Sequence, residues 1–282
     1  MKVRKTIKQI IRHLVLTALA LFWLIPIIWL LVTALGAEKG INTNHFFPEK
    51  WSLDNFAQLF FRPDSVANFP AWFKNSFIIG CACCVISSVF VLMVAYAFSC
   101  MRFKGRKALM NFSIIIGMFP GVLSMLAIYF VMKLLGLNDS LIGLIVVYSA
   151  GSGLGYLICK GFFDTIPVSL REAAKIEGAS ELTTFVRIVI PLSKPMIVYT
   201  VINSFMAPWM DFVMARIMIN SKEPANWTVS IGLYNILQKT LIGDYFAVFC
   251  AGGLIVAVPL SILFVIMQKF YVEGITGGAV KG

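Results

Sequence analysis

The sequence predicts an all-α integral membrane protein with six transmembrane helices, and three observations lead to this fold class. First, 59% of the 282 residues are hydrophobic and only 13% are charged, with a mean hydropathy of +0.87, which is too apolar for a soluble domain. Second, six apolar runs each reach the length of about 20 residues that a helix needs to cross the hydrocarbon core. Third, the cations gather in the short connections between these runs, which cover residues 14–35, 76–100, 108–132, 140–163, 196–218 and 246–270.

The first apolar run follows a basic head, so a cleaved secretory signal has to be considered. A signal peptide has an apolar region of about 7 to 15 residues, and the run at 14–35 is longer than that. We interpret it as a retained membrane anchor with a kink at Pro26.

Lysines and arginines set the predicted orientation, because cytoplasmic loops carry an excess of them. Most of the 24 basic residues fall in the N-terminal head, in the connections near 102–107 and 160–194, and in the C-terminal tail. We therefore expect both termini in the cytoplasm. The same distribution accounts for the net charge of +11 without a nucleic-acid partner.

Six cysteines all fall within or at the edge of an apolar run. Cys81 and Cys84 have CxxC spacing, but a lipid-embedded helix with no histidine nearby is a poor zinc or redox site. We expect these cysteines to be small packing residues, and no metal site is predicted.

The chain divides into three predicted parts. Residues 1–70 form the anchor and an outer loop, residues 71–270 a five-span core, and residues 271–282 a cytoplasmic tail. Within the core, Gly117, Pro120 and Gly121 predict a bend in the third span, because proline removes a backbone hydrogen bond. The bend could line a cavity or be an ordinary kink. Gly151 and Gly155, four residues apart in the fourth span, favour close helix approach over nucleotide binding.

The stretch EAAKIEGASELTTFVRIVIP, residues 172–191, is unusually polar for this chain. Ser169 and Glu172 have capping-box spacing, so a helix is expected to start there. Gly178 suits a left-handed C-cap. Ser180 is expected to cap a second helix that runs to Ile190 and ends at Pro191, with an apolar face at Leu182, Phe185, Val186 and Val189. By physical chemistry alone, this unit could enter a partner's cleft or be a solvated connector.

The same stretch resembles the EAA signature of ATP-binding-cassette (ABC) importer permeases, in which EAA is followed by a glycine three residues later and then by a proline. Further stretches, among them WSLDNFAQLF, YAFSCMRFKGRKAL, GFFDTIP and QKFYVEGITGGAVKG, resemble the sugar-importer subfamily of the maltose type, from about residue 51 to the end. The resemblance implies the type I ABC importer permease fold. It departs from the usual pattern at Glu177, where aspartate is more common.

The resemblance implies that residues 172–191 form the element that couples the permease to an ATPase. Glu172 would make the main polar contact, Ala173 and Ala174 would permit a close fit, Gly178 would supply the turn and Pro191 would complete the motif. The chain lacks the G-x-x-x-x-G-K-[ST] loop that holds ATP, so ATP and magnesium would be bound by partner subunits. No cofactor and no catalytic residue are expected in this chain, which we interpret as a transport subunit and not an enzyme.

The resemblance also implies the partners: a second permease subunit in a heterodimer, two ATPase subunits, an extracytoplasmic solute-binding protein, an oligosaccharide substrate and membrane lipid. The tail residues Glu273, Gly274, Gly277 and Gly278 would contact the ATPases. The outer segment 219–237 would meet the binding protein, with Asn226 and Trp227 suited to sugar contact, although Trp227 could equally be an interfacial anchor.

Asp211 and Arg216 are the only clearly central ionisable residues of the spans, and such residues are usually functional or paired. Five residues apart, they would point about 140° away from each other on an ideal helix, so each would need a separate partner or a polar cavity. The segment APWMDF resembles a part of oligosaccharide permeases near the translocation path, which assigns Trp209, Asp211 and Phe212 to the substrate pathway.

The sequence thus predicts the permease subunit of an ATP-driven carbohydrate importer, multi-pass in a bacterial cytoplasmic membrane. Malto-oligosaccharides are the first expected cargo, and galacto-oligosaccharides or another polar solute the alternative. An ion-coupled carrier would need more intramembrane acids than Asp211. A membrane enzyme would need convergent polar groups, and the only histidines are His13 and His45.

Overall fold

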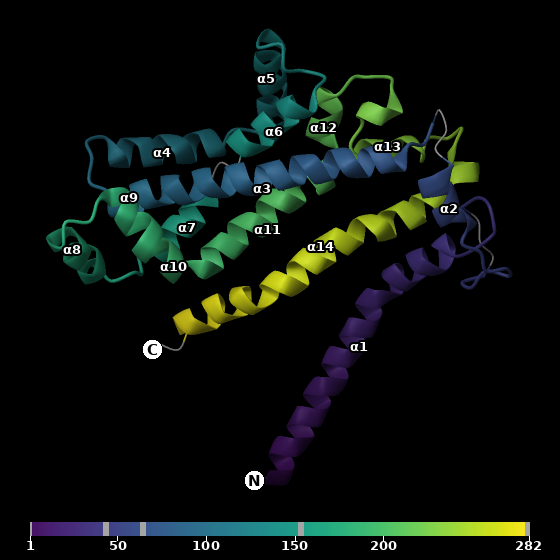
Figure 1. The fold of residues 1–282 in the computed structure, drawn as a ribbon. Coiled ribbons are helices and arrows are strands. Elements are labelled where there is room, and N and C mark those ends of the chain that lie inside the picture. Colours follow the sequence, from purple (N-terminus) through teal and green to yellow (C-terminus); the bar gives the residue numbers. More distant parts are fainter. Residues whose placement is uncertain (1, 42–44, 63–65, 152–154, 280–282) are drawn as a thin grey trace. The chain divides into compact units, whose positions relative to one another are not determined.

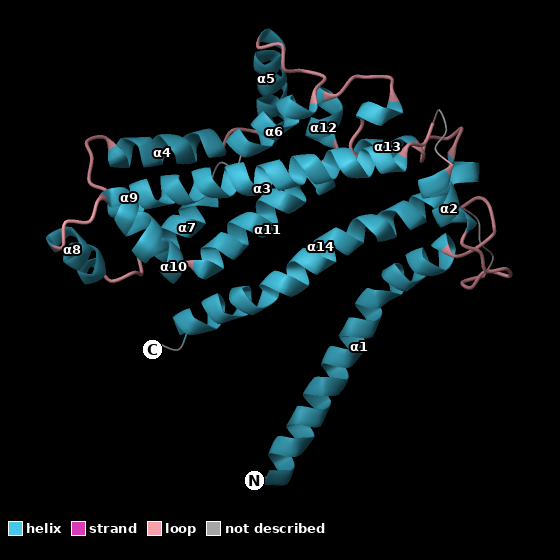
Figure 2. Ribbon diagram, in the orientation of Figure 1, coloured by secondary structure: helices cyan, strands magenta, loops and turns pink. Residues whose placement is uncertain are grey.

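The computed structural model describes residues 2–41, 45–62, 66–151 and 155–279. Within these ranges the chain is helical and contains no strand, only an isolated bridge between Gly36 and Trp51 (Figure 2). The predicted all-α fold is therefore confirmed.

The chain divides into two compact units. Unit 1 comprises residues Met1–Pro70 and Gly232–Ala257, and unit 2 comprises Ala71–Ile231 and Val258–Gly282. One break between the units falls between Pro70 and Ala71. The segment 232–257, expected in the core, belongs to the compact unit of the N-terminal residues.

Unit 1 contains α1 (Lys2–Ala34), α2 (Asp54–Phe61) and the first part of α14 (Ile242–Ala279). Most apolar side chains of α1 are exposed, as expected for a helix whose solvent is lipid, and Pro26 lies inside it. The carbonyls at the end of α1 need partners. Asn55 supplies them, because its Nδ2 donates to the oxygens of Ala34 and Gly36 at 3.0 and 2.7 Å.

Unit 2 is built on α3 (Phe69–Cys100), which belongs to it from Ala71 onward. Along the chain follow α4 (Arg106–Gly117), α5 (Gly121–Leu134), α6 (Leu141–Ala150) and α7 (Gly155–Phe163). Then come α8 (Val168–Ile176), α9 (Glu181–Thr184), the π-helical η1 (Phe185–Val189) and α10 (Ile190–Leu192). The unit continues with α11 (Lys194–Met210), α12 (Val213–Met218), η2 (Pro224–Asn226) and α13 (Val229–Asn235), the last of which continues into unit 1 (Figure 1).

Three helices are long and apolar enough to cross a membrane, at Thr6–Ala34, Phe69–Cys100 and Ile242–Lys269. Three bent pairs raise the number to six if each pair is one span: α4 with α5, α6 with α7, and α9–α10 with α11. The six predicted spans are thus recovered only with broken helices. The break between α4 and α5 falls at the predicted glycine and proline positions, but its angle of 102° is far sharper than a kink.

The fifth span differs from the prediction of one helix over 196–218. Helix α11 ends at Met210, Asp211 is extended with φ −82° and ψ 115°, and α12 starts at Val213. The expected 140° offset between Asp211 and Arg216 assumed a continuous helix and is therefore wrong. Arg216 is exposed.

A core cluster of unit 2 joins the second half of α3 to α7 and η1 through buried residues such as Leu92, Tyr96, Phe163 and Val189. At the other half of α3, Gly80 allows close approach to α11. A Cβ there would lie 2.9 Å from Trp209 Nε1 and 3.2 Å from the Phe205 carbonyl oxygen. Helix α3 thus packs against α7 and η1 with its second half and against α11 with its first half.

Candidate coupling segment and membrane cavity

Helix α8 carries the EAA residues and lies at one end of unit 2, beside α9 and α10 (Figure 1). It starts at Val168 with Pro167 as its N-cap residue, and no side chain caps it. The capping box predicted at Ser169 and Glu172 is therefore wrong. Proline already holds the φ angle suited to a helix start, and the helix begins one residue before Ser169.

The end of α8 follows the prediction. Gly178 has φ +80°, and two backbone bonds close the turn, from Gly178 N to Lys175 O (3.0 Å) and from Ala179 N to Ala174 O (2.9 Å). This is the Schellman arrangement, in which a residue in the left-handed conformation ends the helix. The chain therefore reverses sharply after α8.

Glu172 and Ala173 are exposed on α8, as a docking surface requires. Ala174, in contrast, is only 6% exposed. The two alanines thus face different ways, and the close fit predicted for both is available only to Ala173.

The second helical segment differs from the prediction in two ways. Ser180 caps it as expected, its Oγ accepting from Thr183 N at 3.1 Å, but the segment stays helical to Leu192, and Pro191 lies inside α10. In addition, Leu182 is 67% exposed, and Val186 is exposed as well. The reason is the π turn of η1, which inserts extra backbone into the helix and breaks the 3.6-residue period that the apolar face assumed.

Glu181 ties α8 to α3, a role that sequence reasoning missed. Its Oε1 lies 2.6 Å from Lys175 Nζ, and its Oε2 accepts from the Tyr96 hydroxyl at 2.7 Å. The bond from Lys175, with that from Tyr96, holds the pKa of Glu181 below its usual value of 4.5, against a smaller opposing effect of burial. One carboxylate therefore links α8 to α3.

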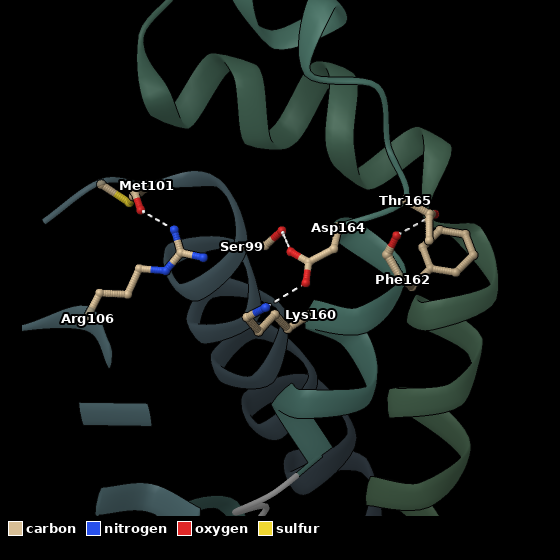
Figure 3. A network of polar contacts seen from close by, with 7 residues as sticks. All are labelled: Ser99, Met101, Arg106, Lys160, Phe162, Asp164 and Thr165. Carbon is tan, nitrogen blue, oxygen red and sulfur yellow. Dashed lines mark hydrogen bonds and ion pairs between the residues drawn. The ribbon is translucent and has the colours of Figure 1, made fainter. Parts of the chain in front are cut away.

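A second network braces the same end of the unit (Figure 3). Asp164, just after α7, accepts from Ser99 Oγ of α3 and from Lys160 Nζ of α7, both at 2.6 Å. Burial raises the pKa of Asp164, but these two hydrogen bonds outweigh it and lower the pKa overall. Arg106 at the start of α4 donates to the Met101 carbonyl at 3.2 Å, so the ends of α3, α4 and α7 are each held by polar contacts.

A cavity of about 430 Å³ lies beside the break between α11 and α12. Its polar lining comes mainly from α6, α11 and the Asp211 break: Ser87, Tyr148, Tyr199, Thr200, Asn203, Ser204 and Asp211. Discontinuous helices with a polar residue at the break are typical of substrate sites within membranes. The lining residues of α11 and its C-cap recur at helical spacing, at Thr200, Asn203 or Ser204, Ala207 and Asp211. This spacing is visible in the sequence and could have indicated a polar helix face, but the prediction did not use it.

Asp211 is the only one of the three predicted pathway residues that lines this cavity. Its Oδ1 accepts from Met214 N at 3.1 Å and so supports the start of α12, and its carbonyl accepts from Ser230 Oγ at 2.9 Å. Trp209 is 3% exposed and packs edge-on against Phe73. Phe212 is half-buried.

The outer segment is fastened to the first half of α3. Trp227 is 7% exposed, stacks on Trp72 and donates from Nε1 to the Ser221 carbonyl at 2.8 Å. Asn75 Nδ2 donates to the carbonyls of Ala225 and Trp227 at 2.8 and 2.9 Å. Trp227 is thus engaged in internal packing and is neither open to a sugar nor an interfacial anchor, because tertiary contacts bury its ring.

Asn226 remains exposed, with its Nδ2 3.1 Å from Ser221 Oγ. Of the two residues predicted for sugar contact, it is the one that a partner can reach.

The predicted tail residues lie in the last turns of α14, which remains helical to Ala279. They are Glu273, Gly274, Gly277 and Gly278, and their side chains lie outside the part of the chain whose side chains the structure describes. Within the described ranges, no three metal-ligating side chains come together.

Comparison with known proteins supports the resemblance to ABC importer permeases that the sequence indicates. Residues 92–276, more than half of the chain, match the family described as binding-protein-dependent transport system inner membrane component. A galactooligosaccharide transport system permease protein, GanQ, of Bacillus subtilis strain 168 is 31% identical over 100% of this chain and 99% of its own. A maltodextrin transport system permease protein, MdxG, of the same organism is 33% identical, with 99% and 98% covered.

The solved structure of a bacterial ABC transporter involved in the import of the acidic polysaccharide alginate has the same fold. Its chain aligns with a TM-score of 0.78 at 20% identity, over 94% of this chain and 96% of that one. The predicted resemblance to ABC importer permeases and the predicted permease fold are thus confirmed. The chain therefore belongs to the family of binding-protein-dependent transport system inner membrane components and is a multi-pass protein of the cytoplasmic membrane.

Proposed function

We propose that this chain is the permease subunit of an ATP-driven oligosaccharide importer and that α8 is its coupling helix. The observation that carries the proposal is the placement of α8: Glu172 and Ala173 are exposed, while Glu181 and the Gly178 turn hold the helix against the unit. A helix with one exposed face and with its other face tied to the rest of the unit is suited to transmit the movement of a partner.

The route from α8 to the cavity is short and runs along the chain. After the Gly178 turn, α9, η1 and α10 form one helical segment, which meets α11 at an angle of 87°. Helix α11 then lines the cavity through Tyr199 and Asn203 and ends beside Asp211. Displacement of α8 by a partner would therefore move the cavity wall, and Tyr96 would carry part of the same displacement into α3.

Partner subunits would supply the energy and the cargo. We infer two ATPase subunits that bind ATP and magnesium, a second permease subunit and an extracytoplasmic solute-binding protein. The tail residues Glu273, Gly274, Gly277 and Gly278 are candidates for additional ATPase contact, and Asn226 for contact with the binding protein. Both termini would lie in the cytoplasm.

Malto-oligosaccharides are the first proposed cargo, and galacto-oligosaccharides the second. Two relatives with these cargoes in their names are 33% and 31% identical to this chain, a difference too small to choose between them. The choice must therefore come from transport measurements.

The test is uptake of radiolabelled maltotriose and of a galacto-trisaccharide into membrane vesicles that contain the assembled importer and its binding protein. Internal ATP is supplied and ion gradients are collapsed. Glu172→Ala is compared with Glu177→Ala, which removes the same charge from another exposed position of the segment.

We expect uptake that needs ATP, ignores the gradients and falls at least about tenfold in Glu172→Ala, equivalent to about 1.4 kcal/mol, while Glu177→Ala retains most of it. Uptake that persists without ATP and follows a proton or sodium gradient would refute the proposal. Equal losses in both variants would leave Glu172 with no special role.

A further inference from the structure

We propose that the cavity beside the Asp211 break is a binding subsite for one neutral sugar ring, and that its single carboxylate selects against acidic saccharides. The inference rests on the proposed importer function and concerns which cargo this chain itself admits. It assigns to this subunit a direct part in specificity.

The lining suits a sugar in size and chemistry. A volume of about 430 Å³ is within the range of small-molecule sites, which combine apolar walls with a few placed polar groups. The lining includes the aromatic side chains of Tyr148 and Tyr199, a residue type whose ring can pack against the C–H face of a sugar. Hydroxyl, amide and carboxylate groups of Ser204, Asn203 and Asp211 match sugar hydroxyls, which both donate and accept.

Several of these groups have hydrogen-bonding capacity left for a ligand. The Tyr148 hydroxyl is buried and interacts with the Asp211 carboxylate, and its oxygen can still accept a hydrogen bond from a ligand. Asn203 donates through Nδ2 to the Tyr199 carbonyl at 2.8 Å, which leaves its amide oxygen as an acceptor.

The charge of the lining gives the selectivity. Among the lining residues described here, Asp211 is the only acidic one, and none is lysine, arginine or histidine. Two carboxylates a few ångströms apart repel each other, and the repulsion grows as water is displaced from between them. A neutral ring can donate hydroxyls to Asp211, whereas a ring carrying a carboxylate would meet this repulsion with no cation to offset it.

The fold alone does not make this distinction. The solved importer with the same fold takes part in the import of the acidic polysaccharide alginate. Acidic cargo is therefore compatible with the architecture, and the side chains of the cavity have to decide which saccharides enter.

The experiment measures equilibrium binding of radiolabelled maltotriose and of maltotriose with one 6-hydroxymethyl group oxidised to a carboxylate. The assembled importer is held in lipid nanodiscs at pH 7 without the binding protein, so that the membrane site alone is measured. Asp211→Asn removes the charge, and its amide oxygen can still accept from Met214 N. Asp139→Asn is the matched control, because Asp139 Oδ1 also accepts backbone N–H groups, from Asn220 and Ser221, and does not line the cavity.

We expect the wild type and Asp139→Asn to bind the neutral sugar at least about tenfold more tightly than the acidic one, and Asp211→Asn to reduce this preference to less than about threefold. Tyr148→Phe should weaken neutral binding about fivefold, a result that does not depend on the folding of the Asp211 variant. An unchanged preference in a well-folded Asp211→Asn complex would overturn the selectivity.

Two further outcomes separate this inference from the importer function. Absence of sugar binding in nanodiscs, combined with ATP-dependent uptake in vesicles, would overturn the subsite and leave the function standing. Unchanged neutral binding in Tyr148→Phe would likewise overturn the subsite. Failure of ATP-dependent uptake itself, measured independently, is what would refute the proposed function.

Discussion

At the scale of single residues, Gly178 shows how one backbone angle can set the position of a docking surface. Its φ of +80° lies in the region that other residues enter only at a cost of about 1–2 kcal/mol. A Cβ at Gly178 would meet no atom within 4 Å, so the requirement for glycine comes from the backbone and not from crowding. The turn keeps α8 and α9 in their present relation.

Gly178→Ala should therefore reduce binding-protein-stimulated ATP hydrolysis about fivefold, the factor that about 1 kcal/mol produces, with little change in the amount of protein in the membrane. The measurement is ATPase activity of the assembled importer in proteoliposomes. Gly161→Ala is the control, because Gly161 lies inside α7 with an ordinary helical angle and nothing within 4 Å of its would-be Cβ. Equal activity in the two variants would contradict the role assigned to the turn.

At the scale of elements, the proposed coupling helix α8 is tied to the unit through Glu181. Lys175 of α8 and Tyr96 of α3 both contact the carboxylate of Glu181, which lies at the start of α9. Because the pKa of Glu181 is lowered in the folded protein, this tie stabilises the fold above the ordinary pKa of 4.5 and loses its effect as the pH falls through the lowered value. The attachment of α8 should thus weaken only under acid conditions and be fully present at neutral pH.

Glu181→Gln should remove this pH dependence and loosen α8 at neutral pH, because glutamine cannot form the charged pair with Lys175. The measurement is amide hydrogen exchange of residues 168–192 at pH 3.5 and pH 7, corrected for intrinsic rates. We expect several-fold faster exchange in the variant at pH 7 and a smaller difference from the wild type at pH 3.5, because the carboxyl of Glu181 loses its charge as the pH falls through its lowered pKa. Glu223→Gln, in the outer segment, is the control. Faster exchange of residues 168–192 in Glu223→Gln, or unchanged exchange of these residues in Glu181→Gln, would contradict the role of Glu181 in holding α8.

At the scale of the whole molecule, the distribution of cations predicts the orientation in the membrane. The connection that contains Lys104 is rich in basic residues, whereas the outer segment around Lys222 is not. Positive loops remain on the cytoplasmic side, and the proposed docking of α8 to an ATPase requires the same orientation.

Single cysteines at these positions test the orientation in a background freed of the six native cysteines. A membrane-impermeant maleimide should label Lys222→Cys in right-side-out vesicles and Lys104→Cys only after inversion or permeabilisation. Both lysines are exposed, so the labelling reports sidedness and not burial. The reverse pattern would place α8 outside the cytoplasm and remove the basis of the coupling proposal.

Part of the coupling segment could be read directly from the sequence. The left-handed turn at Gly178 and the cap at Ser180 depend on local backbone and side-chain chemistry, and both are present. The predicted start of α8 and the predicted apolar face of the next helix were wrong. Pro167 replaces Ser169 as the cap residue, and the π turn of η1 changes the period that the face assumed.

The sequence by itself determined that the chain lies in lipid and that its apolar runs are helical, because every backbone group must find a partner within the membrane. It also located the bend at Pro120 and the turn at Gly178, both local properties. Only the tertiary structure decided the 102° break, the end of α11 at Met210, the burial of Trp227 and the interaction of Tyr148 with Asp211. These depend on contacts between residues far apart in the chain, which no local pattern encodes.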